Sequence, residues 1–189
     1  AEVPDYNVNY IQLGAYCLSN PGWVFWDDVE LAEWEPPHGV INVPDDYNRI
    51  QLAIDASEDG DEVHVAPGEY VENINFNGRN ISVIGNPDNP GDVVIDGGGN
   101  GSVVSFTSEE PRSVLLSGFT LRNGTGTDYE NGNLYGGGIY IVRSSPTIQD
   151  CIIEDNQANV GGGGFYIHLT PANPIFERCI IRNNSSDGH

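Results

Sequence analysis

The residues 123–133, "NGTGTDYENGN", bring two carboxylates and a phenol ring together within three positions. Asp128 and Glu130 carry the oxygen ligands that Ca²⁺ prefers, and Tyr129 between them offers a ring on which a sugar can stack. The spacing is not that of an EF-hand loop, so a solvated loop is the favoured interpretation. We therefore expect no required cofactor, and calcium is the ion that this stretch could hold.

Other ligand and nucleophile patterns are absent from the sequence. The three Cys, at 17, 151 and 179, form no CxxC pair, and the four His form no HxxxH pattern. A zinc site is not expected. The "GGGG" run at 161–164 is not a phosphate-binding loop, because neither a helix pattern nor a Lys follows it.

The net charge of the chain excludes some classes of binding partner. It has 28 acidic and 7 basic residues, a formal net charge of −21, and every basic residue is Arg. Such a surface repels phosphate backbones and anionic headgroups, so neither nucleic acid nor a membrane surface is an expected partner. No apolar run is long enough to insert into a bilayer. An acidic chain of this kind suits an extracellular or cell-surface location.

The segment 136–189 repeats itself, and the repeat predicts the architecture. "IQDCIIEDNQA" around Cys151 aligns with "FERCIIRNNSS" around Cys179, and "LSGFTLRNGTG" around Phe119 gives a third copy. The copies are offset by 32 and 28 residues, a period typical of stacked coils. The runs between turn residues are short and β-rich, without helical periodicity. The chain is therefore predicted to be all-β, a right-handed parallel β-helix.

This register predicts columns of side chains. Phe119, Cys151 and Cys179 should stack inside the solenoid, with Cys151 and Cys179 as reduced thiols, although a disulfide between them is the alternative. Four further columns are expected. One lies inside and consists of Leu121, Ile153 and Ile181. Two lie outside, one of Arg122, Glu154 and Arg182 and one of Asp150 over Arg178, and the fourth is Asn156 over Asn184 at a turn.

Residues 40–85 contain a helix pattern followed by strands. Ile50, Ala53 and Ile54 have helical spacing and predict a capping helix near 47–57. The stretch "GDEVHVAPGEYVENI" follows at 60–74. It resembles the first coil of the pectate-lyase-like superfamily of right-handed parallel β-helix proteins, in which a short helix closes the solenoid end. Covering that end protects unpaired strand edges.

The resemblance to this superfamily implies a fold but no particular activity. The superfamily includes lyases, hydrolases, adhesins and structural modules. Its lyases use Ca²⁺-binding Asp residues and an Arg or Lys base, and its hydrolases use clustered Asp residues. Arg143 and Arg112 are the candidate bases, since the other arginines of the repeats have acidic neighbours one coil away. Asp128 and Glu130 are the candidate acidic residues. Ion pairs between coils are the favoured role for Asp150 and Glu154.

Residues 1–36 do not follow the repeat. "YIQLGAYCLSNPGWVFWDDVEL" predicts a β-hairpin, and "GWVFWDDVEL" resembles the last strand of carbohydrate-binding jelly-roll modules. The segment is expected to be the tail of such a module, a hairpin packed on its own solenoid, or a strand donated to a neighbouring copy. Trp23 and Trp26 join Tyr129 as candidate carbohydrate-binding residues.

We thus divide the chain into a hairpin segment, 1–36, and a β-helix, 37–189, expected to be incomplete at its C-terminal end. The leading hypothesis is a non-catalytic extracellular module with a structural, adhesive or assembly role, including filament formation by self-association, that also contacts carbohydrate. The alternative is a polysaccharide lyase or glycoside hydrolase that acts in a groove on the solenoid face.

Overall fold

The computed structural model describes residues 38–169 and 171–188. The predictions for residues 1–36, including the hairpin and the roles of Trp23 and Trp26, lie outside the described residues and stay predictions. Among the described residues, no helix is long and apolar enough to span a membrane.

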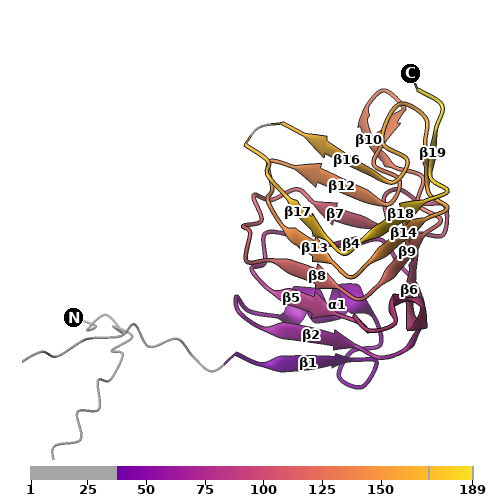
Figure 1. Ribbon diagram of the computed structural model, residues 1–189. Coiled ribbons are helices and arrows are strands. Elements are labelled where there is room, and N and C mark those ends of the chain that lie inside the picture. The colour runs from indigo at the N-terminus through magenta and orange to yellow at the C-terminus, as the bar shows by residue number, and fades with distance from the viewer. Residues whose placement is uncertain (1–37, 170, 189) are drawn as a thin grey trace, which may run out of the picture. The chain divides into compact units, whose positions relative to one another are not determined.

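Three parallel sheets form the walls of a solenoid (Figure 1). Each complete coil contributes one short strand to each sheet, and the strand pairs with its counterpart in the next coil. Sheet A contains β1 (Val40–Val43), β2 (Glu62–Val65), β5 (Ser82–Ile84), β8 (Leu115–Ser117), β13 (Thr147–Gln149) and β17 (Ile175–Glu177). Sheet B contains β3 (Gly68–Val71), β6 (Val93–Asp96), β9 (Thr120–Arg122), β14 (Ile152–Glu154) and β18 (Ile180–Arg182). Sheet C contains β4 (Ile74–Asn75), β7 (Val104–Phe106), β12 (Ile139–Val142) and β16 (Phe165–His168).

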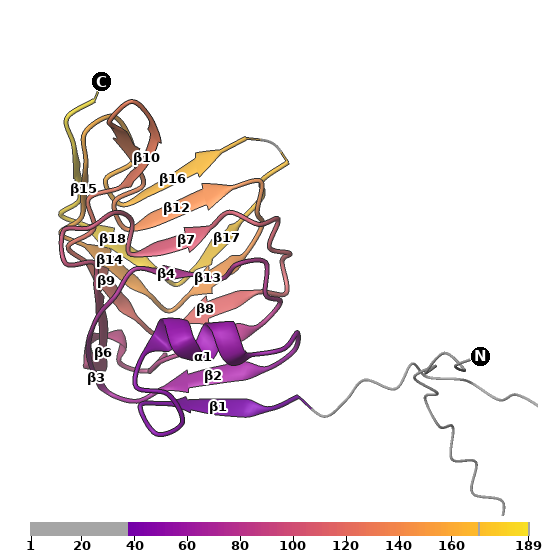
Figure 2. The same cartoon turned by 180° about the vertical axis from the view of Figure 1, so that it is seen from behind.

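The solenoid is right-handed. In Figure 1 the strands of sheet A lie in front and run to the right, the strands of sheet C run to the left behind them, and the coils rise toward the C-terminus. Figure 2 shows sheet C from its own side. The predicted fold, an all-β right-handed parallel β-helix with one short helix, is confirmed.

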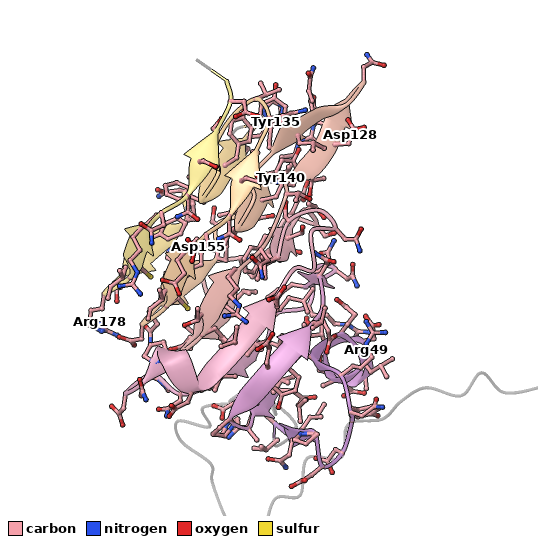
Figure 3. The ribbon with its side chains drawn as sticks, turned by 90° about the vertical axis from the view of Figure 1, so that its right-hand side faces the viewer. Arg49, Asp128, Tyr135, Tyr140, Asp155 and Arg178 are labelled. Carbon is pink, nitrogen blue, oxygen red and sulfur yellow. The ribbon has the colours of Figure 1, made fainter. Side chains whose placement is uncertain are left out.

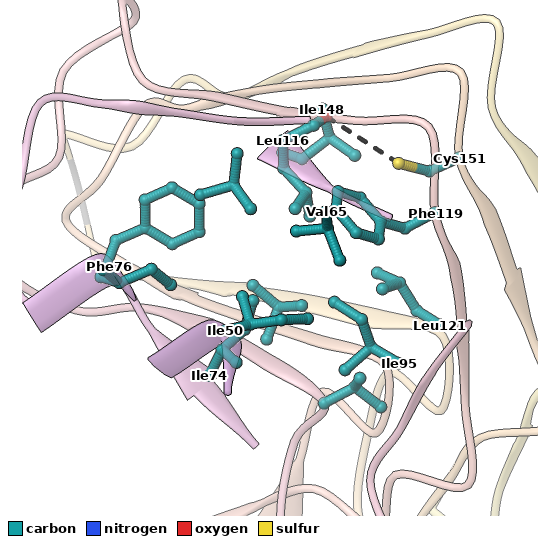
Figure 4. Packing of buried hydrophobic residues seen from close by; sticks show 14 of the residues in the cluster. Ile50, Val65, Ile74, Phe76, Ile95, Leu116, Phe119, Leu121, Ile148 and Cys151 are labelled. Atoms are coloured by element: carbon teal, nitrogen blue, oxygen red, sulfur yellow. Dashed lines mark hydrogen bonds between the residues drawn. The ribbon is translucent and has the colours of Figure 1, made fainter. Parts of the chain in front are cut away.

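The strand register confirms the predicted inner columns, although Ile181, in the last described coil, is 44% exposed. Leu121, Ile153 and Ile181 are direct partners in sheet B. Phe119 and Cys151 are fully buried in the core, and Cys179 packs against it from the last described coil. Figure 4 shows how the side chains of Phe119, Leu121 and Cys151 point into the space that the coils enclose. The repeat offsets of 32 and 28 therefore correspond to true turns of the solenoid.

Asparagines fix the turn between sheets B and C. The Asn156 side chain is buried; its Oδ1 accepts a hydrogen bond from the Gly124 N–H (2.8 Å), and its Nδ2 donates to the Leu121 carbonyl (3.0 Å) and to Asn184 Oδ1 (3.0 Å). The predicted Asn156–Asn184 stack is thus confirmed. At Gly124 a Cβ atom would collide with the Gly137 carbonyl, which precedes β12, so only glycine allows this close approach.

The capping helix is α1 (Ile50–Ala56), which buries Ile50, Ala53 and Ile54 as the spacing predicted. It has no side-chain cap of its own at its first turn. The cap comes from the next segment, where the buried Glu72 carboxylate accepts hydrogen bonds from the N–H groups of Ile50 (2.9 Å) and Gln51 (3.1 Å). The carboxylate also lies 3.5 Å from Arg49 Nε. Glu72 therefore joins the helix to the first coil.

The predicted outer ion pairs are present in part. Arg178 binds Asp150 through two hydrogen bonds (2.6 and 2.8 Å), and Arg182 lies 2.7 Å from Glu154. Arg122 differs, because it pairs with Asp96 (3.1 Å) and Glu69 (3.0 Å) of the preceding coils. The hydrogen bond from Arg178 lowers the pKa of Asp150 despite the opposing effect of burial. Exposed pairs of this kind contribute about 0–1 kcal/mol each.

Cys151 and Cys179 are free thiols, as the sequence favoured. Burial raises the pKa of Cys151 to about 12 and also raises that of the half-buried Cys179. At pH 8 the thiolate fraction of Cys151 is then about one in ten thousand. In a Cys17→Ser variant treated with iodoacetamide at pH 8, mass spectrometry should find Cys151 unmodified while Cys179 reacts slowly. Both thiols should react fast in denaturant, and equally fast labelling of Cys151 in the native protein would contradict this burial.

Candidate functional site

The outer face of sheet C carries aromatic side chains on its later strands. Ile139 and Ile141 of β12 point into the core, so Tyr140 between them points outward, and the register pairs it with Tyr166 of β16. Their rings are stacked, with centroids 6.4 Å apart and planes 7° from parallel. The same alternation places His168 outward, and its ring stacks at 5.9 Å from that of Tyr166.

A β-hairpin adds two more rings to this face. β10 (Thr127–Glu130) and β11 (Asn133–Tyr135) are the antiparallel pair of the described structure, joined by Asn131 and Gly132, both with positive φ. The Tyr129 ring lies 4.5 Å from that of His168, and the Tyr135 ring lies 4.5 Å from that of Tyr166. We call the five residues Tyr129, Tyr135, Tyr140, Tyr166 and His168 the aromatic cluster.

Hydrogen bonds hold the hairpin on the next coil. Asn159 accepts a bond from the Leu134 N–H (2.6 Å) and donates one to the Gly132 carbonyl (2.7 Å). Asp128 accepts bonds from the Gly132 N–H (3.1 and 3.2 Å) and so closes its own turn. Figure 3 shows Asp128 and Tyr135 on the upper coils near Tyr140. The hairpin is therefore a fixed part of the surface.

The members of the cluster differ in exposure. Tyr129 is 45% exposed, whereas Tyr140 is only 4% exposed although it points outward, because neighbouring rings cover it. Burial raises the pKa of the Tyr140 hydroxyl, and the nearby phenols of Tyr129 and Tyr166 add to that effect. His168 Nε2 is buried and has no hydrogen-bond partner among the described residues. Tyr129 is thus the ring most open to a ligand.

Arg143 lies beside the cluster at the end of β12, where its N–H donates to the His168 carbonyl (3.2 Å). Its side chain is exposed and has no hydrogen bond or ion pair with any residue in the described ranges. The other six arginines bind carboxylates or carbonyls. Arg112, the second candidate base, donates to the Asn173 carbonyl at 3.4 Å.

Arg143 borders a pocket of about 310 Å³, here called the Arg143 pocket, whose lining includes Glu109, Glu110 and Ser145. Glu110 is 1% exposed, and its carboxylate accepts hydrogen bonds from the N–H groups of Gly78 and Ser108 (2.9 Å each) and from the Ser144 hydroxyl (2.5 Å). No sequence pattern predicted this buried acid, which joins three coils through its hydrogen bonds.

A second concavity follows the ends of the sheet B strands. This corner groove, of about 320 Å³, is lined by residues that include Asp96, Asn123, Asp155 and Gln157. Burial acts to raise the pKa of Asp96, but hydrogen bonds from the Gly98 N–H, Asn123 and Arg122 outweigh it, so the pKa lies below its usual value. Asp96 closes a tight bend by accepting a hydrogen bond from the Gly98 N–H (2.9 Å), and Asp155 is exposed.

The fold brings together only some of the residues that the sequence predicted as a functional site. Tyr129 joins the aromatic cluster with Arg143 nearby, while Asp128 serves its own turn and Glu130 ends β10. No group of three or more Asp, Glu, His or Cys residues converges as a metal site among residues 38–169 and 171–188. Calcium binding at Asp128 and Glu130 stays a prediction.

No protein-family model matches the chain, and no curated protein matches it. Solved structures similar to it include the Aspergillus niger pectin methylesterase in penultimately deglycosylated form, at 19% identity and TM-score 0.49, covering 82% of this chain and 60% of that one. Escherichia coli YbhC is similar at 16% identity and TM-score 0.49, covering 85% and 54%. The chain spans about half to three fifths of their length. Matches at this level carry no inference about activity, and the fold rests on the strand register.

Proposed function

We propose that this chain is a non-catalytic, extracellular or cell-surface β-helix module that contacts polysaccharide through the aromatic cluster. One observation carries the proposal: five rings from three separated segments meet on one face, with Tyr129 left 45% exposed. The apolar face of a sugar packs on such rings, while phenol hydroxyls are available for hydrogen bonds. The rigid hairpin keeps this surface formed before a ligand arrives, which lowers the entropic cost of binding.

The carboxylates of the described coils support binding over catalysis. Asp150, in the bend before β14, and Glu154, at the end of β14, are each held by an arginine of the next coil. Asp128 is held by the turn of its hairpin. A glycosidase needs two carboxyl groups whose pKa values are pushed apart across a scissile bond. None of these three is placed for that role.

Tyr129→Ala should weaken binding to a polysaccharide about two- to tenfold, since one stacked ring contributes about 0.5–1.5 kcal/mol. Tyr129→Phe should keep most of the affinity, because it retains the ring. The measurement is affinity electrophoresis or calorimetry against a panel of soluble polysaccharides. Tyr47→Ala is the matched control, a 38% exposed tyrosine near α1. Equal binding by wild type and Tyr129→Ala would remove the site from the aromatic cluster.

A glycoside hydrolase or lyase is the second candidate, and the corner groove favours it because Asp96 and Asp155 line it together. The test is incubation with the same panel, with and without Ca²⁺, while unsaturated and reducing ends are followed. Turnover lost in Asp155→Asn would assign the activity to the corner groove. Turnover lost in Arg143→Ala or Asp128→Ala would assign it to the face that carries the hairpin.

Self-association into filaments remains part of the proposal as a separate property. Light scattering coupled to size-exclusion chromatography and electron microscopy of the same sample measure it. Polymers that persist in a Tyr129→Ala variant would show that assembly and carbohydrate contact use different surfaces.

A further inference from the structure

The aromatic cluster lies on a chain that offers almost no free positive charge. Six of the seven arginines are engaged with carboxylates or carbonyls, and there is no lysine. Of the arginines, all of which are described, Arg143 is left without a side-chain partner in the described ranges. Any anionic ligand of the cluster would depend on this one guanidinium.

Arg143 does not make its surroundings positive. Glu109 and Glu110 line the same pocket, so the pocket carries two carboxylates and one guanidinium. The partners of Glu110 are neutral N–H and hydroxyl groups, and none of them cancels its formal charge. Glu109 is exposed at the rim. The local balance thus has the same sign as the net charge of −21.

The ligand-facing groups of the cluster are uncharged as well. Tyr129, Tyr135 and Tyr166 offer phenol rings, and burial of Nε2 removes one nitrogen of His168 from contact with solvent. Stacking on such rings needs no charge on the sugar, whereas each negative substituent would meet a like-charged surface. The site should therefore bind uncharged sugars in preference to negatively charged ones.

We infer that the ligand of the aromatic cluster is an uncharged polysaccharide, a polymer of neutral hexoses or N-acetylhexosamines, and that Glu109 contributes to the exclusion of acidic polysaccharides. This inference rests on the proposed carbohydrate contact and adds the ligand class and one specificity-determining residue. It predicts that affinity depends on ring stacking and hydrogen bonds and is nearly independent of ionic strength.

Calorimetry with the 189-residue chain tests this at 20, 150 and 500 mM NaCl. The probes are cellohexaose, mannohexaose and N-acetylchitohexaose as neutral sugars, hexagalacturonate as an acidic one, and glucosamine hexamer as a cationic one. We expect at least one neutral probe to bind with a Kd that changes less than twofold across the salt series. Hexagalacturonate should bind at least tenfold more weakly at 20 mM NaCl.

Glu109→Gln should raise the affinity for hexagalacturonate several-fold at 20 mM NaCl and leave the neutral probe unchanged. Glu58→Gln is the control, because it removes the same charge near the capping helix. Two outcomes overturn the inference while the proposed function stands: Tyr129-dependent binding of hexagalacturonate as tight as that of any neutral probe, or preference for the cationic hexamer with an affinity that falls with salt. Failure of all probes to bind would overturn the proposed function together with it.

Discussion

Asn156→Ala should lower the free energy of unfolding by about 3–5 kcal/mol, one of the two largest effects expected from a single change. The truncation leaves the buried N–H of Gly124 and the carbonyl of Leu121 without their partner. Each buried group left unpaired costs about 1–3 kcal/mol. Urea denaturation followed by circular dichroism measures the change. The midpoint should fall without a change in slope, because the surface exposed on unfolding stays the same.

Asn184→Ala is the matched control for this result. Asn184 occupies the same turn one coil later, is less buried, and donates to the Ile153 carbonyl (2.8 Å). Its Oδ1 also accepts hydrogen bonds from the N–H and the Nδ2 of Asn156 (3.0 Å each). Because these bonds lie nearer solvent than those of Asn156, their combined loss should cost about 1–2 kcal/mol. Equal effects at the two positions would contradict the view that burial, and not the amide type alone, makes the Asn156 turn essential.

Glu72→Ala should cost about 2–4 kcal/mol and make the protein prone to aggregation. The change removes the acceptor for the first two N–H groups of α1, and the helix has no other side-chain cap. A loosened α1 would uncover Ile50 and Ile54 together with the end of the solenoid. Urea denaturation and static light scattering at increasing temperature measure both effects.

Two variants separate capping from the ion pair. Glu72→Gln keeps one acceptor oxygen and should lose roughly half as much stability. Arg49→Ala removes only an exposed partner at 3.5 Å and should change stability by about 0–1 kcal/mol. A loss at Arg49→Ala as large as that at Glu72→Ala would mean that the ion pair, not the helix cap, carries the contribution.

The solenoid could be predicted because its coils repeat the same local pattern. Inward residues recur at fixed places relative to Cys151 and Cys179, so aligning the copies gave the register that sheets A and B adopt. The helix could be predicted because Ile50, Ala53 and Ile54 follow the helical period. The role of Glu72 as cap could not, since it joins residues 22 positions apart.

Only part of the aromatic cluster could be predicted from the sequence. "IYI" and "FYI", 26 residues apart, already place Tyr140 and Tyr166 on one outer face through their alternation. Asn131–Gly132 is a two-residue hairpin signal in the sequence. The contact of Tyr129 with His168 depends on how the hairpin folds back, which no local pattern specifies. Asp96 and Asp155 are 59 positions apart, and only the stacking of coils puts them in one groove.

Carbohydrate contact at the aromatic cluster is tested most directly by an NMR titration with the neutral hexasaccharide of highest affinity. We predict shifts in the ring resonances of Tyr129, Tyr166 and His168 and in the Arg143 side chain. The amides of Gly98 and Gly99 in the corner groove should not move. Shifts centred on Gly98 and Gly99, with the tyrosine rings unchanged at saturation, would contradict the account.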